Sequence, residues 1–92
     1  MEERRRETRN TEFLEIREIN RQPGDGSYIL DHTSLGAKLE SSLTFTPGDG
    51  VEFSYQQPGD GQVIQRWGQV IWVLPAPEKP GRFLLGVEFL LT

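Results

Sequence analysis

Two short polar segments carry the residue types that could bind an anion or a nucleobase. The first lies within residues 1–10 and contains Arg4, Arg5, Arg6 and Arg9. A guanidinium presents a planar fork of donors that can chelate a phosphate or pair with the O6 and N7 edge of guanine. Arg5 and Arg9 stand four positions apart. On charge pattern alone, the alternative interpretation is a solvated chain end.

The second segment runs from Asp31 to Gly36 and leads directly into a strand pattern that starts at Ala37. It combines a carboxylate, the Thr33 hydroxyl and a glycine. Such a group could read a donor-rich edge such as N1 and N2 of guanine, with Gly36 allowing close approach of the backbone. The alternative is an Asx-type turn that joins two strands.

Catalysis and metal binding find little support in the residue types. The chain has no cysteine and a single histidine, which excludes thiolate chemistry and multi-histidine metal sites. Asp31, His32 and Ser34 are too close in sequence to form a triad easily, so we expect His32 to be a loop residue. Each Gly-Asp-Gly loop offers one carboxylate, whereas calcium takes six to eight oxygen ligands. We therefore expect a protein that is not an enzyme and holds no metal or cofactor.

Length and charge narrow the class of partner. The 92 residues suffice for one small domain, and the net charge is −4. Residues 1–10 sum to +1 and residues 11–92 to −5, so DNA and RNA are disfavoured as partners. No apolar stretch has the length of a membrane span or of a signal peptide, which makes the cytoplasm the expected location.

The elements that must position these segments are β-strands. Apolar and polar residues alternate with a period of two in several segments, the clearest being Val51, Phe53 and Tyr55. The expected strands are 13–20, 28–30, 37–45, 51–56, 63–74 and 82–91. Gly68 would permit a bend or bulge in the fifth of these. A run of strands with no strong helix pattern predicts an all-β fold, a small six-stranded antiparallel barrel.

The connecting segments support the same fold. The tetrapeptide Pro-Gly-Asp-Gly occurs three times, at 23–26, 47–50 and 58–61, and a fourth turn spans 75–81. Proline presets φ for the first central turn position and glycine accepts a positive φ at the second. We expect a chain reversal at each of these places.

Taken in order along the chain, the motifs resemble those of the PilZ domain, the bacterial receptor module for cyclic di-GMP. The R-x-x-x-R limb is Arg5 to Arg9, the D-x-S-x-x-G motif is matched by Asp31, Thr33 and Gly36, and the closing strand contains Gly-x-x-Phe at 86–89. The resemblance covers nearly the whole chain. Thr33 stands where the family usually has serine, which keeps the hydroxyl but adds a β-branch.

The resemblance implies a PilZ-type β-barrel over residues 11–92, preceded by a flexible arginine-rich limb over residues 1–10. Many family members carry a helix after the last strand. This sequence stops at Thr92, so we expect little or no C-terminal helix.

It also implies a binding site for cyclic di-GMP made by Arg5, Arg9, Asp31, Thr33 and Gly36, with assistance from Arg4 or Arg6. Trp72 could stack on a guanine or, alternatively, fill the barrel interior. Ordering of the limb over the ligand would change the contacts made with a protein effector.

Two other functions stay open at this point. A PilZ-like adaptor that has lost the ligand would act through protein contacts alone, which the threonine at position 33 and the short ending favour. An oligonucleotide-binding barrel would need exposed aromatics in a basic groove, and the charge of residues 11–92 argues against it.

Overall fold

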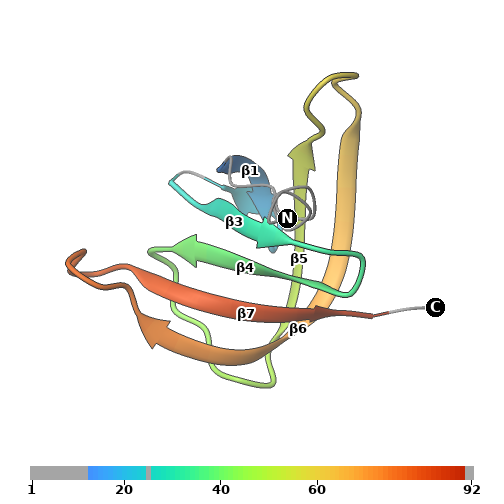
Figure 1. The fold of residues 1–92 in the computed structure, drawn as a ribbon. Helices are drawn as coiled ribbons and strands as arrows, with labels where there is room; N and C mark the ends of the chain where they lie inside the picture. The colour runs from blue at the N-terminus through green and yellow to red at the C-terminus, as the bar shows by residue number, and fades with distance from the viewer. Residues whose placement is uncertain (1–12, 25, 91–92) are drawn as a thin grey trace, which may run out of the picture.

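The computed structural model describes residues 13–24 and 26–90, and all regular secondary structure in them is β-strand (Figure 1). The strands are β1 (Leu14–Ile19), β2 (Gln22–Pro23), β3 (Tyr28–His32), β4 (Gly36–Ser41), β5 (Gly50–Gln56), β6 (Val63–Pro75) and β7 (Phe83–Phe89). The described residues contain no helix that could cross a membrane.

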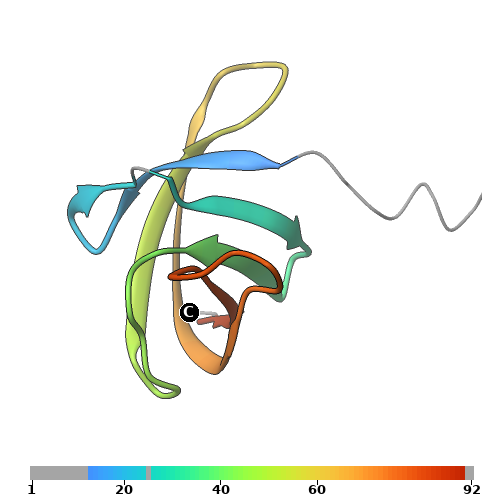
Figure 2. The same ribbon diagram turned by 90° about the vertical axis from the view of Figure 1, so that its left-hand side faces the viewer.

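The sheet closes on itself to form a barrel. Its strand order is β2-β1-β3-β4-β7-β6-β5, and all neighbouring strands run antiparallel. β1 also pairs with β5, where Ile16 lies opposite Tyr55 and Ile19 opposite Phe53. Figure 2 shows β1 crossing β5, with β3, β4 and β7 following one another along the wall. Six strands close the barrel and the two-residue β2 is an addition, so the predicted six-stranded antiparallel barrel is confirmed.

The barrel interior is filled by every second residue of the strands. Phe53, Leu39 and Leu85 are at most 1% exposed. The predicted alternation in β5 is confirmed, because Val51, Phe53 and Tyr55 all point inward and are buried. Burying a side chain of this size contributes about 1.5 to 3 kcal/mol, and these residues therefore supply most of the driving force for closure.

The long strand β6 contains a bulge, but at a different place from the one expected. The register with β7 shifts between Val70 and Trp72, so Ile71 is the extra residue. Gly68 lies in regular pairing, with Phe89 opposite it. A Cβ at position 68 would overlap Val87 and the backbone of Glu88. Glycine is therefore needed at position 68 for close strand packing.

Two predicted boundaries differ from the structure. The strand expected over 37–45 ends at Ser41, whose Oγ accepts a hydrogen bond from the Leu43 amide at 3.0 Å and thereby turns the chain. The first chain reversal is at Asn20 and Arg21, with φ of 51° and 67°, so it precedes the Pro-Gly-Asp-Gly segment. Pro23 itself lies in β2, paired with Glu18. Asparagine tolerates the left-handed conformation, which explains a turn that carries no glycine.

Candidate functional site

The predicted turn motif joins β3 to β4, but only its middle is a turn. Asp31 and His32 belong to β3, where they pair with Lys38 and Ala37 of β4. The expectation that His32 is a loop residue was therefore wrong. Its imidazole faces the barrel, 5.9 Å from the ring of Tyr55 between centroids. The pairing continues β3 further than the short apolar run of 28–30 indicated.

Thr33 organises the turn through its backbone and its side chain. Its amide donates to the Gly36 carbonyl at 2.9 Å, which closes the turn. Its Oγ1 accepts a hydrogen bond from the Leu35 amide at 3.1 Å. An acceptor role leaves the hydroxyl hydrogen available to a ligand. Threonine thus supports the turn as serine would, and its side chain is exposed.

Asp31, Thr33 and Gly36 line one shallow hollow of about 270 Å³, together with His32, Ala37 and Lys38. The structure therefore brings together the three described members of the predicted motif. A carboxylate, a hydroxyl and an ammonium group surround the same space, so the hollow can both accept and donate hydrogen bonds.

Gly36 has a second reason to be glycine. A Cβ at this position would overlap the carbonyl oxygen of Val87 on the neighbouring strand β7. The close approach seen in the structure is thus between β4 and β7.

A row of paired residues extends from this hollow across the outer face of the barrel. Asp31 lies opposite Lys38, Lys38 opposite Gly86, and Gly86 opposite Trp72. Directly paired residues project from the same face of a sheet. Lys38 is exposed and was missed as a site residue. Its alternation with the inward-facing Leu39 was the available signal, since it predicts that Lys38 points outward.

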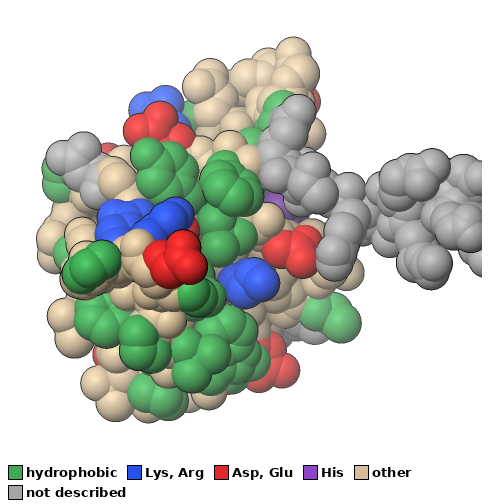
Figure 3. Space-filling view, turned by 60° about the vertical axis from the view of Figure 1, so that its left-hand side comes forward, with side chains coloured by type: hydrophobic (Ala, Val, Ile, Leu, Met, Phe, Trp, Pro, Cys, Tyr) green, Lys and Arg blue, Asp and Glu red, His purple; other side chains and the backbone are tan. Residues whose placement is uncertain are grey.

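Trp72 lies on this outer face and not in the barrel interior. Its neighbour Val73 packs against the core, so Trp72 points the other way and is half-buried. A Cβ at Gly86 would overlap the indole, which shows that the ring lies across the backbone of that glycine. The interpretation of Trp72 as barrel filling was therefore wrong. Figure 3 shows hydrophobic side chains gathered beside basic and acidic ones on the surface of the barrel.

The arginine limb cannot be placed against this row, because Arg4, Arg5, Arg6 and Arg9 lie outside the described residues. The described chain starts at Phe13, one residue before β1. Leu14 lies opposite Ile29, which precedes Asp31 by two residues on β3. The chain therefore enters the barrel beside the strand that carries the site carboxylate.

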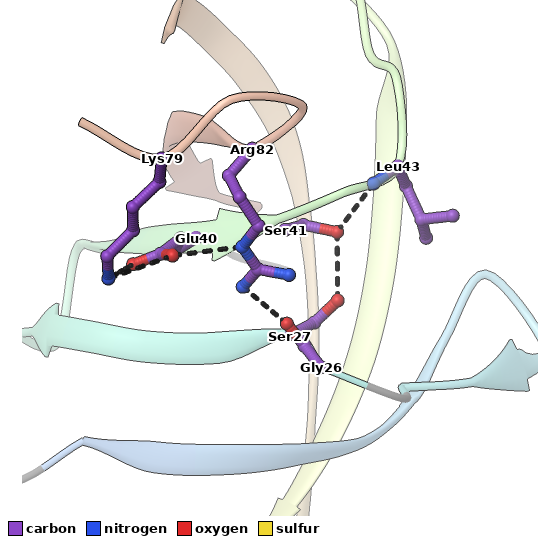
Figure 4. Close-up of polar contacts among 7 residues, drawn as sticks. All are labelled: Gly26, Ser27, Glu40, Ser41, Leu43, Lys79 and Arg82. Carbon is purple, nitrogen blue, oxygen red and sulfur yellow. Dashed lines mark hydrogen bonds and ion pairs between the residues drawn. The ribbon is translucent and has the colours of Figure 1, made fainter. Parts of the chain in front are cut away.

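An ion-pair cluster holds the far end of β4 (Figure 4). Glu40 is 6% exposed and accepts hydrogen bonds from Arg82 Nε at 3.0 Å and from Lys79 Nζ at 3.3 Å. Arg82 also donates to the Gly26 carbonyl. Burial raises the pKa of Glu40, but the hydrogen bonds and charges of Arg82 and Lys79 outweigh it, so the pKa is lowered from 4.5. The cluster thus connects β4 to the β6–β7 turn and to Gly26 before β3.

Among residues 13–24 and 26–90, no three histidine or acidic side chains gather in a way that could hold a metal ion. The candidate site is the hollow together with the outer row, which offer hydrogen-bonding groups, charge and a half-buried indole.

Comparison with known proteins agrees with this geometry. No curated protein and no solved structure matches the chain significantly. The family model of the PilZ domain, however, matches residues 3–92. Because that match spans essentially the whole chain and the fold is the small β-barrel with the motif turn described above, this protein belongs to the PilZ domain family.

Proposed function

We propose that this protein is a receptor for cyclic di-GMP and that Asp31, Thr33 and Gly36 form the fixed half of its site. Membership of the PilZ family supports the proposal, because PilZ domains generally are receptor modules for cyclic di-GMP, although the family also includes ligand-independent adaptors. The observation that carries the proposal is the hollow of about 270 Å³, which all three motif residues line.

Arg5 and Arg9 form the second half of the proposed site, with Arg4 or Arg6 assisting. Each guanidinium would bind a phosphate or a guanine edge through charge-assisted hydrogen bonds worth about 1.5 to 3 kcal/mol. The chain length allows it: at about 3.5 Å per residue, Arg9 reaches up to about 14 Å from Phe13 and Arg5 up to about 28 Å. The start of β1 beside β3 places the hollow within that range.

The two guanines of the ligand would meet different groups. The Asp31 carboxylate accepts hydrogen bonds from N1 and N2 of one guanine, and Thr33 adds its hydroxyl. Trp72 offers the exposed part of its indole to a base, and such stacking contributes roughly 1 to 3 kcal/mol. Lys38, between Asp31 and Trp72 in the same row, would neutralise a phosphate.

The proposed output follows from the two halves of the site. Residues 1–10 act as a flexible limb that becomes ordered when it folds over the ligand on the barrel of residues 11–92. This ordering covers part of the outer face and changes the contacts available to a protein effector. The signal is thus a change of surface, without a chemical reaction.

Titration calorimetry with cyclic di-GMP in moderate salt tests the proposal. The Arg5→Ala, Arg9→Ala double variant should lose most of the affinity. An Arg17→Ala, Arg21→Ala double variant is the matched control, because it removes the same charge from exposed positions near the β1–β2 turn. Absence of binding by the wild type at tens of micromolar would leave the ligand-independent adaptor as the function. Equal binding by both double variants would refute the assigned limb.

A further inference from the structure

A second hollow lies on the outer face of β5 and β6, apart from the motif turn. Its volume is about 360 Å³, and its lining includes Gly50 and Glu52 of β5, Trp67 of β6 and Leu90 after β7. The row of pairs that contains Gly50 runs through Gln69 and Glu88 before it reaches β4. β7 lies between the β5–β6 pair that carries this hollow and the β3–β4 pair that carries the motif hollow, and no residue lines both hollows.

The apolar wall of the hollow is exposed to solvent. The side chains of Trp67 and Leu90 are 53% and 59% exposed. They lie across from each other, since the Leu90 amide donates to the Trp67 carbonyl at 2.9 Å. Large adjacent apolar side chains on a surface often mark a contact site.

The acidic wall is a single carboxylate held in a defined place. Glu52 is paired with Trp67, so both side chains project from the same face. Asn20 holds the backbone of Glu52 through two hydrogen bonds. The side-chain Oδ1 of Asn20 accepts from the Glu52 backbone amide at 2.9 Å, and the backbone amide of Asn20 donates to the Glu52 carbonyl at 2.8 Å. Gln65 Nε2 donates to Glu52 Oε2 at 3.2 Å.

Among the described residues, no ion pair forms with the Glu52 carboxylate. The ion pairs within this part of the chain are those of Glu40. Of the residues that the structure describes, no lysine or arginine lines the hollow, although Arg21 follows Asn20 in the neighbouring turn.

Gly50 lines the hollow and leaves open space there, because it has no side chain. A Cβ placed on Gly50 would meet nothing within 4 Å, and its φ lies outside the left-handed region. A larger residue could therefore occupy position 50 without backbone strain. Glycine there is not required by the turn or by packing, and its effect is to keep the hollow open.

We propose that this hollow binds an arginine or lysine side chain presented by a protein partner. The cation would lie between the Trp67 indole, as in a cation–π pair, and the Glu52 carboxylate. Its aliphatic stem would pack on Leu90. The charge of −5 over residues 11–92 favours a basic partner surface for the same reason. The inference does not depend on nucleotide binding.

The test uses a soluble probe, the peptide acetyl-Ala-Arg-Ala-Arg-Ala-amide, and its analogue with citrulline in place of both arginines. Citrulline keeps the shape of arginine but has no charge. Binding is followed by the NMR signal of the Trp67 indole N–H, assigned by its disappearance in Trp67→Phe. We expect a saturable shift with the arginine peptide and about tenfold weaker binding of the citrulline peptide.

Three variants locate the binding. Glu52→Gln, which keeps a hydrogen-bonding oxygen, should weaken binding about tenfold, and Gly50→Met should abolish it by filling the hollow. Glu15→Gln is the matched control, because it removes the same charge from an exposed position on β1. If Gly50→Met did not fold, the difference in peptide affinity between Glu52→Gln and Glu15→Gln would still show whether Glu52 takes part in binding. No saturable Trp67 shift, or equal binding by Glu52→Gln and the wild type, would overturn the proposal.

Discussion

Neighbouring residues of β4, β7 and β6 project alternately from the inner and the outer face of the barrel. The two faces differ in the residue types that they carry. On the inner face, Leu39 lies opposite Leu85, and Leu85 opposite Val73. The two leucines have no exposed surface. On the outer face, the neighbouring row contains Lys38, Gly86 and Trp72. The inner row is uniformly apolar, while the outer row contains a charged side chain, a glycine and an aromatic ring side by side.

The difference shows what each row is for. The inner row has to fill a volume, so any member can be replaced only by a residue of similar size and polarity. In the proposed function, the outer row presents a charge and an aromatic ring to the ligand. Gly86 makes this possible, because the missing side chain admits the Trp72 indole. The inner row serves stability, and the proposed function gives recognition to the outer row.

The largest effect should come from the inner row. Leu85→Ala removes a fully buried side chain and leaves a cavity, so we expect the free energy of unfolding to fall by about 2 to 5 kcal/mol. Lys38→Ala, in the outer row, should change it by less than about 0.5 kcal/mol. Urea denaturation of both variants checks this. A similar loss in the two variants would mean that the outer row also carries the fold.

Two glycines lie too close to a neighbouring strand for a side chain, Gly36 because of backbone atoms and Gly86 because of a side chain. Gly36→Ala meets the Val87 carbonyl and Gly86→Ala meets the Trp72 indole, so each should destabilise the protein by about 1 to 3 kcal/mol through overpacking. Truncating the indole should relieve only the second. We therefore expect Trp72→Leu to be less damaging in a Gly86→Ala background than alone, and simply additive with Gly36→Ala.

A double-mutant cycle by chemical denaturation measures both couplings. Trp72 fluorescence gives a second readout, because displacement of the indole from Gly86 should shift its emission. Additivity of Trp72→Leu with Gly86→Ala would contradict the placement of the ring over that glycine.

The inner row could be predicted from sequence and the outer row could not. Alternation, as in Val51, Phe53 and Tyr55 of β5, is a local signal, and it predicted the inward-facing residues and the barrel, although the bounds of β3 and β4 differ from those expected. Which outward residues meet depends on register between strands distant in sequence. The bulge at Ile71 changes that register by one residue, and no local pattern at 71 announces it.

The part of the candidate site that lies in one short segment of the chain could be predicted from the sequence. Asp31, Thr33 and Gly36 are near neighbours in the chain, so their meeting needed no long-range information. Lys38 was not predicted, although its alternation with Leu39 indicated that it faces outward; only its alignment with Trp72 depends on a distant residue, Gly86 of β7. His32 was misplaced because the strand continues past the apolar residues through pairing with β4.

The smallest expected effect concerns Glu40, an outer-face residue that is nevertheless buried. It lies on the same side of β4 as Lys38, but the β6–β7 turn covers it and supplies Arg82 and Lys79. Glu40→Gln keeps the shape and loses the charge. Because hydrogen bonds to a charged group are worth more than neutral ones, we expect a loss of about 1 to 2 kcal/mol in the free energy of unfolding at neutral pH.

The pH dependence distinguishes this charge from simple packing. The pKa of Glu40 is lowered in the folded protein, so its contribution is fully present above the ordinary value of 4.5 and is lost as pH falls through the folded value. The stability difference between wild type and Glu40→Gln should therefore narrow as the medium is acidified below that ordinary value. Denaturation curves across that range measure it, with Glu15→Gln as the exposed control. A difference that stays constant with pH would mean that Glu40 stabilises the turn by its shape alone, and that burial on the outer face, as on the inner face, is a matter of volume.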